Sequence, residues 1–106
     1  MATLDEFKKI ELKVAEIKEV NDHPRADKLY IIVIDLGDKV KQIVAGIKSS
    51  YSKEDLVGKQ VIVVDNLEPA VLRGVESQGM LLAASDETGI SIISPQRKIR
   101  LGSIVK

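Results

Sequence analysis

Side chains that could carry out catalysis are scarce in this chain. It has one histidine, His23, and no cysteine, so the usual pairs of a nucleophile and a base cannot be assembled. His23 has no second histidine with which to share a metal ion, and next to Pro24 it is interpreted as a structural turn residue. No glycine-rich phosphate loop of either standard spacing occurs. The sequence therefore predicts a protein that is not an enzyme and needs neither a metal ion nor a cofactor.

Residues suited to binding are concentrated in one segment, Asn66–Ser85, which reads NLEPAVLRGVESQGMLLAAS. Its candidate residues are Arg73, Gly74, Ser77, Gln78, Gly79 and Met80. The glycines allow sharp turns or a close approach of the backbone to a ligand. The serine and glutamine offer hydrogen bonds, and the arginine offers a planar fork that matches phosphate. Met80 fits an adaptable surface contact and a place in the core equally well.

The aromatic content and the charge narrow the kind of nucleic acid that could bind. Phe7, Tyr30 and Tyr51 are the only aromatic residues, so a platform of stacked rings for reading single-stranded bases cannot be built. Sixteen cationic residues balance sixteen acidic ones, so attraction to RNA must come from a local group of cations. These features favour recognition of a folded backbone shape over recognition of base sequence.

Length and composition indicate one small β domain. A chain of 106 residues with 44% hydrophobic content is long enough for one core and too short for two. Abundant valine and isoleucine favour strands. No apolar run approaches the roughly 20 residues that span a bilayer, and the N-terminus lacks the apolar stretch of a signal peptide. We therefore expect a soluble, cytoplasmic protein that does not enter a membrane.

The hydrophobic pattern predicts the elements that must hold the polar segment. Capping-box spacings predict short helices after Thr3, over 4–9, and after Ser52. The predicted strands are 10–20, with a bulge near Ala15-Glu16, the two strands of a hairpin over 29–45 around Gly37-Asp38, then 60–64, 80–85 and 90–94. A helix between the third and fourth strands is typical of the five-stranded OB barrel. The apolar tail from Ile90 onward exceeds what one small barrel buries, which favours a symmetric dimer.

Three stretches of the chain resemble a known family. NLEPAVLRGVESQGMLLAAS, HPRADKLYIIVIDLG and QIVAGI are similar to the tRNA-binding domain family. That family includes stand-alone structure-specific tRNA-binding proteins, the C-terminal or beta-subunit domain of methionyl-tRNA synthetase, and related domains in other synthetases and cytokine-like proteins. The resemblance covers nearly the whole chain, from Phe7 to Val105.

The resemblance implies an all-β OB fold that binds the outer corner of tRNA by shape, without selecting one tRNA. It implies a barrel over about residues 7–85 and a C-terminal extension over about 86–106 that forms a homodimer. Its tRNA-binding positions here are Asn66, Arg73, Ser77, Gly79 and Met80, with Lys28 and Lys41 as supporting phosphate contacts. Family members often carry basic residues where this chain has Glu68, Ala70 and Val71, so weaker affinity or a shifted footprint is expected.

Several functions remain open at this stage. The preferred one is a tRNA-binding protein that acts alone or as an accessory subunit adding tRNA affinity to the catalytic subunit of methionyl-tRNA synthetase. A second is a chaperone-like peptide binder associated with export, which one bacterial branch of the family represents. That branch is not expected to keep the Gly79-Met80 pair. A third is a dimerisation module that has lost tRNA binding.

Overall fold

The computed structural model describes residues 1–106 and consists mainly of strands. The helices are α1 (Leu4–Lys8) and α2 (Lys53–Leu56). The strands are β1 (Leu12–Asp22), β2 (Tyr30–Asp35), β3 (Val40–Ala45), β4 (Gln60–Val64), β5 (Ala70–Leu72), β6 (Val75–Ser77), β7 (Met80–Leu81), β8 (Ala83–Asp86), β9 (Gly89–Ile92) and β10 (Ile104–Val105).

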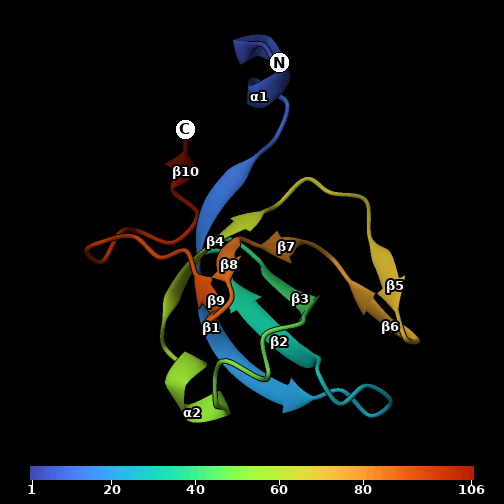
Figure 1. The fold of residues 1–106 in the computed structure, drawn as a ribbon. Coiled ribbons are helices and arrows are strands. Elements are labelled where there is room, and N and C mark those ends of the chain that lie inside the picture. The colour runs from blue at the N-terminus through green and yellow to red at the C-terminus, as the bar shows by residue number, and fades with distance from the viewer.

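Five of these strands form a nearly closed antiparallel barrel in the order β3-β2-β1-β4-β7 (Figure 1). β1 is long enough for two neighbours, so its first half pairs with β4 and its second half with β2. β2 and β3 form the hairpin that the turn residues Gly37-Asp38 predict. With α2 between β3 and β4, this is the predicted five-stranded OB barrel.

The predicted bulge in the first strand exists but lies farther along the chain. The register between β1 and β2 shifts between Ile17 and Glu19, not near Ala15-Glu16. Ala15, Ile17 and Val20 belong to the barrel core, whereas Val14 is buried outside it. The prediction was wrong because it assigned Val14 to the core face, which moved the break in alternation two residues too early.

The barrel interior is filled by aliphatic side chains. In β2 buried residues alternate with partly exposed ones, as expected for a strand with one face on the core. The fully buried larger side chains are Ile17, Ile32, Ile34, Leu36, Ile43, Leu56, Val61 and Val63. Close packing of these residues gives the rigid frame from which the surface segments extend.

Both short helices begin at the predicted capping boxes. Thr3 accepts a hydrogen bond from the Glu6 backbone, and the Glu6 carboxylate accepts one from the Thr3 backbone. Ser52 and Asp55 make the same exchange at α2. α1 has no buried residue and projects from one end of the barrel (Figure 1).

The C-terminal part of the chain returns to the same end as α1. The predicted strand over 80–85 is divided at Leu82, whose N–H donates to the Ile62 carbonyl while its own carbonyl accepts from Ile93. After this break, β8 and β9 form the predicted second hairpin. β10 then pairs with the start of β1, so both termini lie at one end of the molecule (Figure 1).

Candidate nucleic-acid interface

Residues 76–79 of the polar segment, which we call the clasp, close the barrel against β3. The Val44 N–H donates to Ser77 Oγ at 3.0 Å. The Gln42 N–H donates to Gln78 Oε1 at 2.9 Å, and the Gln78 N–H donates to the Gln42 carbonyl at 2.8 Å. Two side-chain hydrogen bonds and one backbone hydrogen bond therefore link β3 to the clasp. β3 and β7 are the two edge strands of the barrel and share no ladder.

Ser77 is part of this closure and is not presented to solvent. It is 5% exposed, and its Oγ also donates to the Gly79 carbonyl at 2.9 Å. Both the donor and the acceptor role of the hydroxyl are thus used within the protein. The sequence suggested a ligand contact for Ser77, whereas the structure gives it a role in positioning the residues that follow.

Gly79 is required by packing inside the protein. A Cβ on Gly79 would lie 2.9 Å from the Val64 carbonyl oxygen and 3.5 Å from Ile43 Cγ2. The sequence predicts that the backbone at Gly79 comes close to another group, and in the structure that group is the backbone of β4. The sequence left open whether the next residue, Met80, lies on the surface or in the core. Its side chain is 48% exposed, so it lies on the surface.

Met80 borders an apolar hollow of about 390 Å³ between the end of β3 and strands β7 and β8. Eight of the ten lining residues are hydrophobic, including Ile47, Leu82 and Ile90. A hollow of this character can accept a base, a sugar or an aliphatic side chain.

β5 and β6 form a small hairpin that the sequence did not predict. Its turn residues, Arg73 and Gly74, have φ angles of +53° and +87°, as in the two-residue turns that match the twist of paired strands. Strands of three residues give too short an alternation to recognise. Gly74 was the available signal, since turns of this kind favour glycine at the second central position.

His23 attaches this hairpin to the loop between β1 and β2. The ring is buried; its Nδ1 accepts from the Arg25 N–H at 3.0 Å and its Nε2 lies 3.0 Å from the Leu72 carbonyl oxygen. These two contacts fit the neutral tautomer that carries its proton on Nε2. The interpretation of His23 as a structural residue is consistent with this geometry, and it places Arg25 beside the hairpin turn.

The loop between β1 and β2 and the hairpin turn carry three exposed cationic residues, Arg25, Lys28 and Arg73, which we call the hairpin cations. Arg73 Nη2 donates to the Arg25 carbonyl at 3.2 Å, and Arg25 Nη1 lies 2.9 Å from the Cβ position of Gly74. All three side chains are exposed and none forms an ion pair. Exposed guanidinium groups without a carboxylate partner are free to bind phosphate.

A second group of cations is already neutralised in part. The Nζ atoms of Lys13, Lys39 and Lys41 lie 2.8, 2.9 and 2.7 Å from the carboxylate of Asp65, whose side chain is 2% exposed. Lys41 also donates to the Asp65 carbonyl oxygen at 2.8 Å. We call these four residues the lysine cluster. The predicted phosphate contact at Lys41 would compete with these interactions.

Asn66 is likewise engaged within the chain. Its Oδ1 accepts from the Glu11 N–H at 2.9 Å, and its side-chain nitrogen donates to the Lys9 carbonyl at 2.6 Å. The side-chain amide therefore joins the start of the polar segment to the backbone between α1 and β1. Although Asn66 is exposed, both groups of its side-chain amide are used in hydrogen bonds to the backbone of Lys9 and Glu11.

The structure thus separates the seven predicted site residues into two sets. Exposed are Arg73, Lys28 and Met80, of which Arg73 also donates one hydrogen bond within the chain; Ser77 is buried, and Gly79, Asn66 and Lys41 are engaged in internal hydrogen bonds. Arg25 was missed, although the motif HisProArgAlaAspLys contains it. An arginine directly after a proline turn was the signal that could have identified it.

No group of three or more His, Cys, Asp or Glu residues is arranged to hold a metal ion. No helix is long and apolar enough to cross a membrane.

Comparison with known proteins places these features in a family. A family model described as "Putative tRNA binding domain" matches residues 12–104. The methionine–tRNA ligases of Thermococcus kodakarensis and Pyrococcus horikoshii are 51% and 52% identical over 104 and 102 residues, which are 98% and 96% of this chain. The chain spans only 14% of the length of each of these relatives.

Two solved structures have closely similar folds over the whole chain. A MetRS-related protein from Pyrococcus horikoshii matches with a TM-score of 0.93 and 36% identity, covering 100% of this chain and 98% of that one. The CsaA chaperone protein from Picrophilus torridus matches with a TM-score of 0.93 and 31% identity, covering 100% of both chains.

Proposed function

The chain belongs to the tRNA-binding domain family, and on this premise we propose that it binds folded tRNA by backbone shape, without selecting one tRNA sequence. The observation that carries the proposal is the group of hairpin cations, Arg25, Lys28 and Arg73, which are exposed and free of acidic partners. Met80 adds an exposed apolar contact at the end of the clasp. The module itself is non-catalytic and acts in the cytoplasm.

We assign different roles in this proposal to Arg25 and to the predicted site residues. Arg73, Arg25 and Lys28 contact phosphates, and Met80 contacts a base or sugar. Ser77, Gly79 and Asn66 act indirectly, because they hold the clasp and the polar segment in place. Ala70 and Val71 are exposed on β5 and Glu68 precedes it, so the absence of cations there lowers the affinity expected of this domain.

Replacing Arg73 with alanine is expected to weaken tRNA binding and to reduce the slope of log affinity against log salt by about one unit. The reason is that one phosphate contact, with its released counterion, is lost. Binding of a folded tRNA measured by fluorescence anisotropy at several salt concentrations gives this slope.

Two matched variants distinguish loss of the phosphate contact from loss of the guanidinium fork and from loss of a cation elsewhere. Arg73→Lys keeps the charge and loses the fork, so it should retain the slope while losing part of the affinity. Lys18→Ala removes a cation that is paired with Glu16 at 2.9 Å, so it should change the slope less. An Arg73→Ala variant with the wild-type slope would exclude Arg73 as a phosphate contact.

We further propose that the chain forms a homodimer through the end that carries both termini. Apolar side chains are exposed there in the single chain: Leu4, Phe7, Ile10 and Ile104 are 66%, 41%, 49% and 73% exposed. β10 pairs with β1, so the extension over about 86–106 ends beside α1. Burying these residues against a second copy removes apolar surface from water, and two linked sites raise avidity for tRNA.

Sedimentation at micromolar concentration is expected to find a dimer, and Ile104→Asp is expected to shift it to monomer because a charge would be buried in the interface. Val57→Asp introduces the same charge at a position that is 52% exposed on the α2 turn, and it should leave the dimer intact. A wild-type monomer at this concentration would reject the proposal.

The identity to methionine–tRNA ligases supports an accessory role in which the domain adds tRNA affinity to a methionyl-tRNA synthetase catalytic subunit. The domain would bind tRNA by itself in the same manner. Adding the protein to a synthetase that lacks such a domain should lower the tRNA concentration needed for half-maximal charging if this role is right. An unchanged concentration would favour a free-standing protein.

One observation favours a second function of another class, the binding of unfolded polypeptide. The apolar hollow beside Met80 suits an aliphatic side chain, and the fold is similar to that of a protein described as a chaperone. Titration with folded tRNA, unfolded RNA and an unfolded polypeptide at several salt concentrations distinguishes these functions. Salt-sensitive preference for folded tRNA supports the first, salt-insensitive binding of polypeptide supports the second, and no binding indicates a dimerisation module.

A further inference from the structure

A polar hollow lies between the turn after α2 and the loop over residues 94–98. Its volume is about 350 Å³, and no acidic side chain lines it. Three of its lining residues are cationic: Lys59, Arg97 and Lys98. The other lining residues are Gly58, Gln60, Ser94, Pro95 and Gln96.

The three cations have no counter-charge in the protein. Lys59, Arg97 and Lys98 are exposed and absent from every ion pair in the chain, whereas six other lysines are paired with carboxylates. Cations held around one hollow repel each other, and an anion entering the hollow removes that repulsion. The arrangement therefore favours an anionic ligand over a neutral one.

The loop that supplies two of these cations is held at both ends by β4. At its start, the Ile62 N–H donates to the Ile93 carbonyl at 3.1 Å. At its end, the Gln60 side chain makes two bonds to Ile99: its Nε2 donates to the Ile99 carbonyl at 2.6 Å, and its Oε1 accepts from the Ile99 N–H at 3.0 Å. Anchoring of both ends limits the conformational freedom that ligand binding would otherwise remove.

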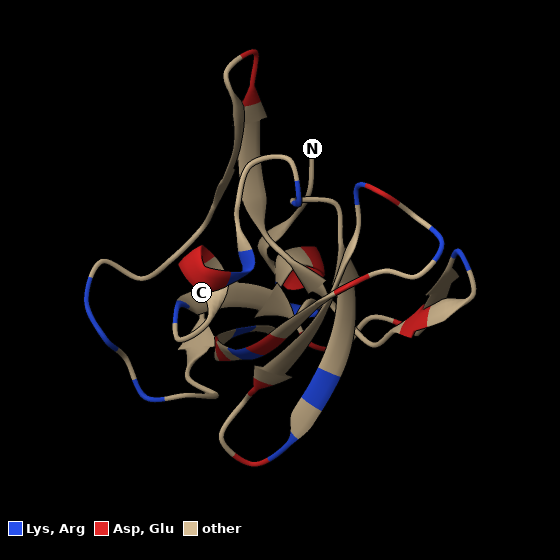
Figure 2. Ribbon diagram, turned by 90° about the horizontal axis from the view of Figure 1, so that it is seen from below, with Lys and Arg blue, Asp and Glu red and all other residues tan.

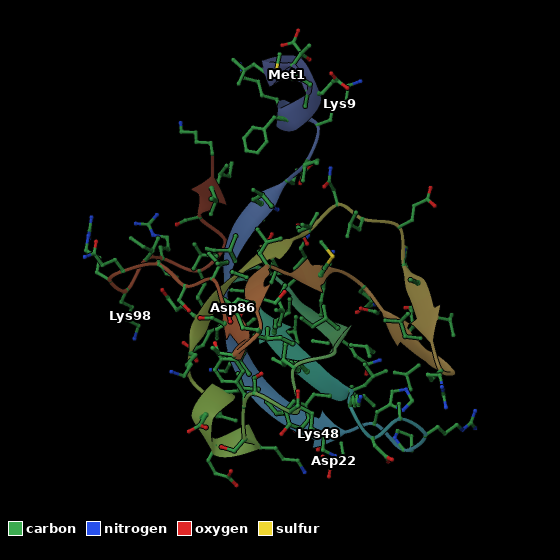
Figure 3. The ribbon with its side chains drawn as sticks, in the orientation of Figure 1. Met1, Lys9, Asp22, Lys48, Asp86 and Lys98 are labelled. Atoms are coloured by element: carbon green, nitrogen blue, oxygen red, sulfur yellow. The ribbon has the colours of Figure 1, made fainter.

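The hollow is remote from the hairpin cations. Lys98 lies on the loop that extends from one side of the barrel (Figure 3), and β5 and β6 extend from the opposite side (Figure 1). Figure 2, turned about the horizontal axis, shows the same separation, with cationic residues at both sides. One phosphate group cannot contact both sets of cations.

We propose that this hollow is a second phosphate-binding site, which takes phosphate groups of an RNA backbone segment other than the segment at the hairpin cations. Arg97 supplies a fork for two phosphate oxygens, Lys59 and Lys98 supply point charges, and Gln96 and Ser94 supply neutral hydrogen-bonding groups. The identity of the ligand as RNA rests on the proposed function. The two sites together make the domain contact RNA on two opposite sides.

The test combines Arg97→Ala with Lys98→Ala in one variant and measures tRNA affinity across salt concentrations. Loss of two phosphate contacts should lower the salt slope by about 1.5–2 units and the affinity at 0.15 M salt by roughly 10- to 30-fold. The control, Lys18→Ala combined with Lys53→Ala, removes the same formal charge from residues paired with Glu16 and Asp22. It should show a clearly smaller change in slope.

If the wild type binds tRNA and the Arg97/Lys98 variant keeps its slope and affinity, the second site is rejected while the proposed function stands. Pyrophosphate provides a test that does not depend on RNA. In amide NMR spectra, pyrophosphate should shift the resonances of residues 58–60, 94 and 96–98 in the wild type and not in the variant. Absence of these shifts overturns the inference, and their presence supports it even if tRNA fails to bind.

Discussion

Replacing Asp65 with asparagine is expected to lower the free energy of unfolding at pH 7 by about 2–3 kcal/mol. The Asp65 carboxylate is 2% exposed and receives the Nζ atoms of Lys13, Lys39 and Lys41 at 2.7–2.9 Å. An amide would leave these three cations close together with no buried anion between them. The lysines are partly exposed, so water screens some of the repulsion and keeps the effect below that of a fully buried pair.

The same substitution should remove part of the acid sensitivity of the protein. Burial alone would raise the pKa of Asp65, but hydrogen bonds from Lys13, Lys41 and Lys39 outweigh it and hold the pKa well below its usual range. A carboxylate with a lowered folded pKa contributes stability that is present above its unfolded pKa, near 3.9, and is lost as pH falls toward the folded value. The two proteins should therefore differ most at neutral pH, and the difference should shrink progressively as pH falls below about 4.

Urea denaturation at pH 7 and at steps between pH 2 and pH 5 measures both effects. Asp22→Asn is the matched control, because Asp22 also contacts two lysines, Lys48 and Lys53, at 3.0 and 3.1 Å. Asp22 and Lys48 lie on the surface (Figure 3), where ion pairs contribute little. Equal stability losses in the two variants would show that burial of Asp65 does not matter.

Elements whose signals are local were predictable from the sequence. The capping boxes at Thr3 and Ser52, the hairpin turn at Gly37-Asp38 and the strand over 60–64 depend on residues within a few positions of each other. Element order then gave the barrel, because few small folds place a helix between the third and fourth strands.

The candidate site was less predictable because its polar residues have distant partners. Ser77 bonds to Val44, 33 positions away, and Asn66 bonds to Lys9, 57 positions away. A serine or asparagine in a glycine-containing segment looks the same whether it binds a ligand or the backbone of another strand. No local pattern marks Asp65 as a charge centre, since the three lysines that neutralise it come from β1, β3 and the turn before β3.

The clasp gives Gly79 a role that follows from this long-range closure. The residue sits between β6, which carries Ser77, and β7, which pairs with β4 at Val63 and Val64. Its carbonyl accepts from Ser77 Oγ, and its Cα faces the Val64 carbonyl so closely that no side chain fits. A Cβ here must push β7 away from β4, the contact that completes the barrel and orients Met80.

Gly79→Ala is therefore expected to lower the free energy of unfolding by about 1–3 kcal/mol, the usual cost of forcing an extra carbon into a packed site. Urea denaturation measures the loss of stability. The rate of amide hydrogen exchange should increase more in β7 than in the other strands. Gly46→Ala is the control, since a Cβ at Gly46 meets only Leu29 Cδ2 at an ordinary 3.6 Å. If Gly79→Ala is no less stable than Gly46→Ala, the glycine is not needed for closure, and its role is at the ligand.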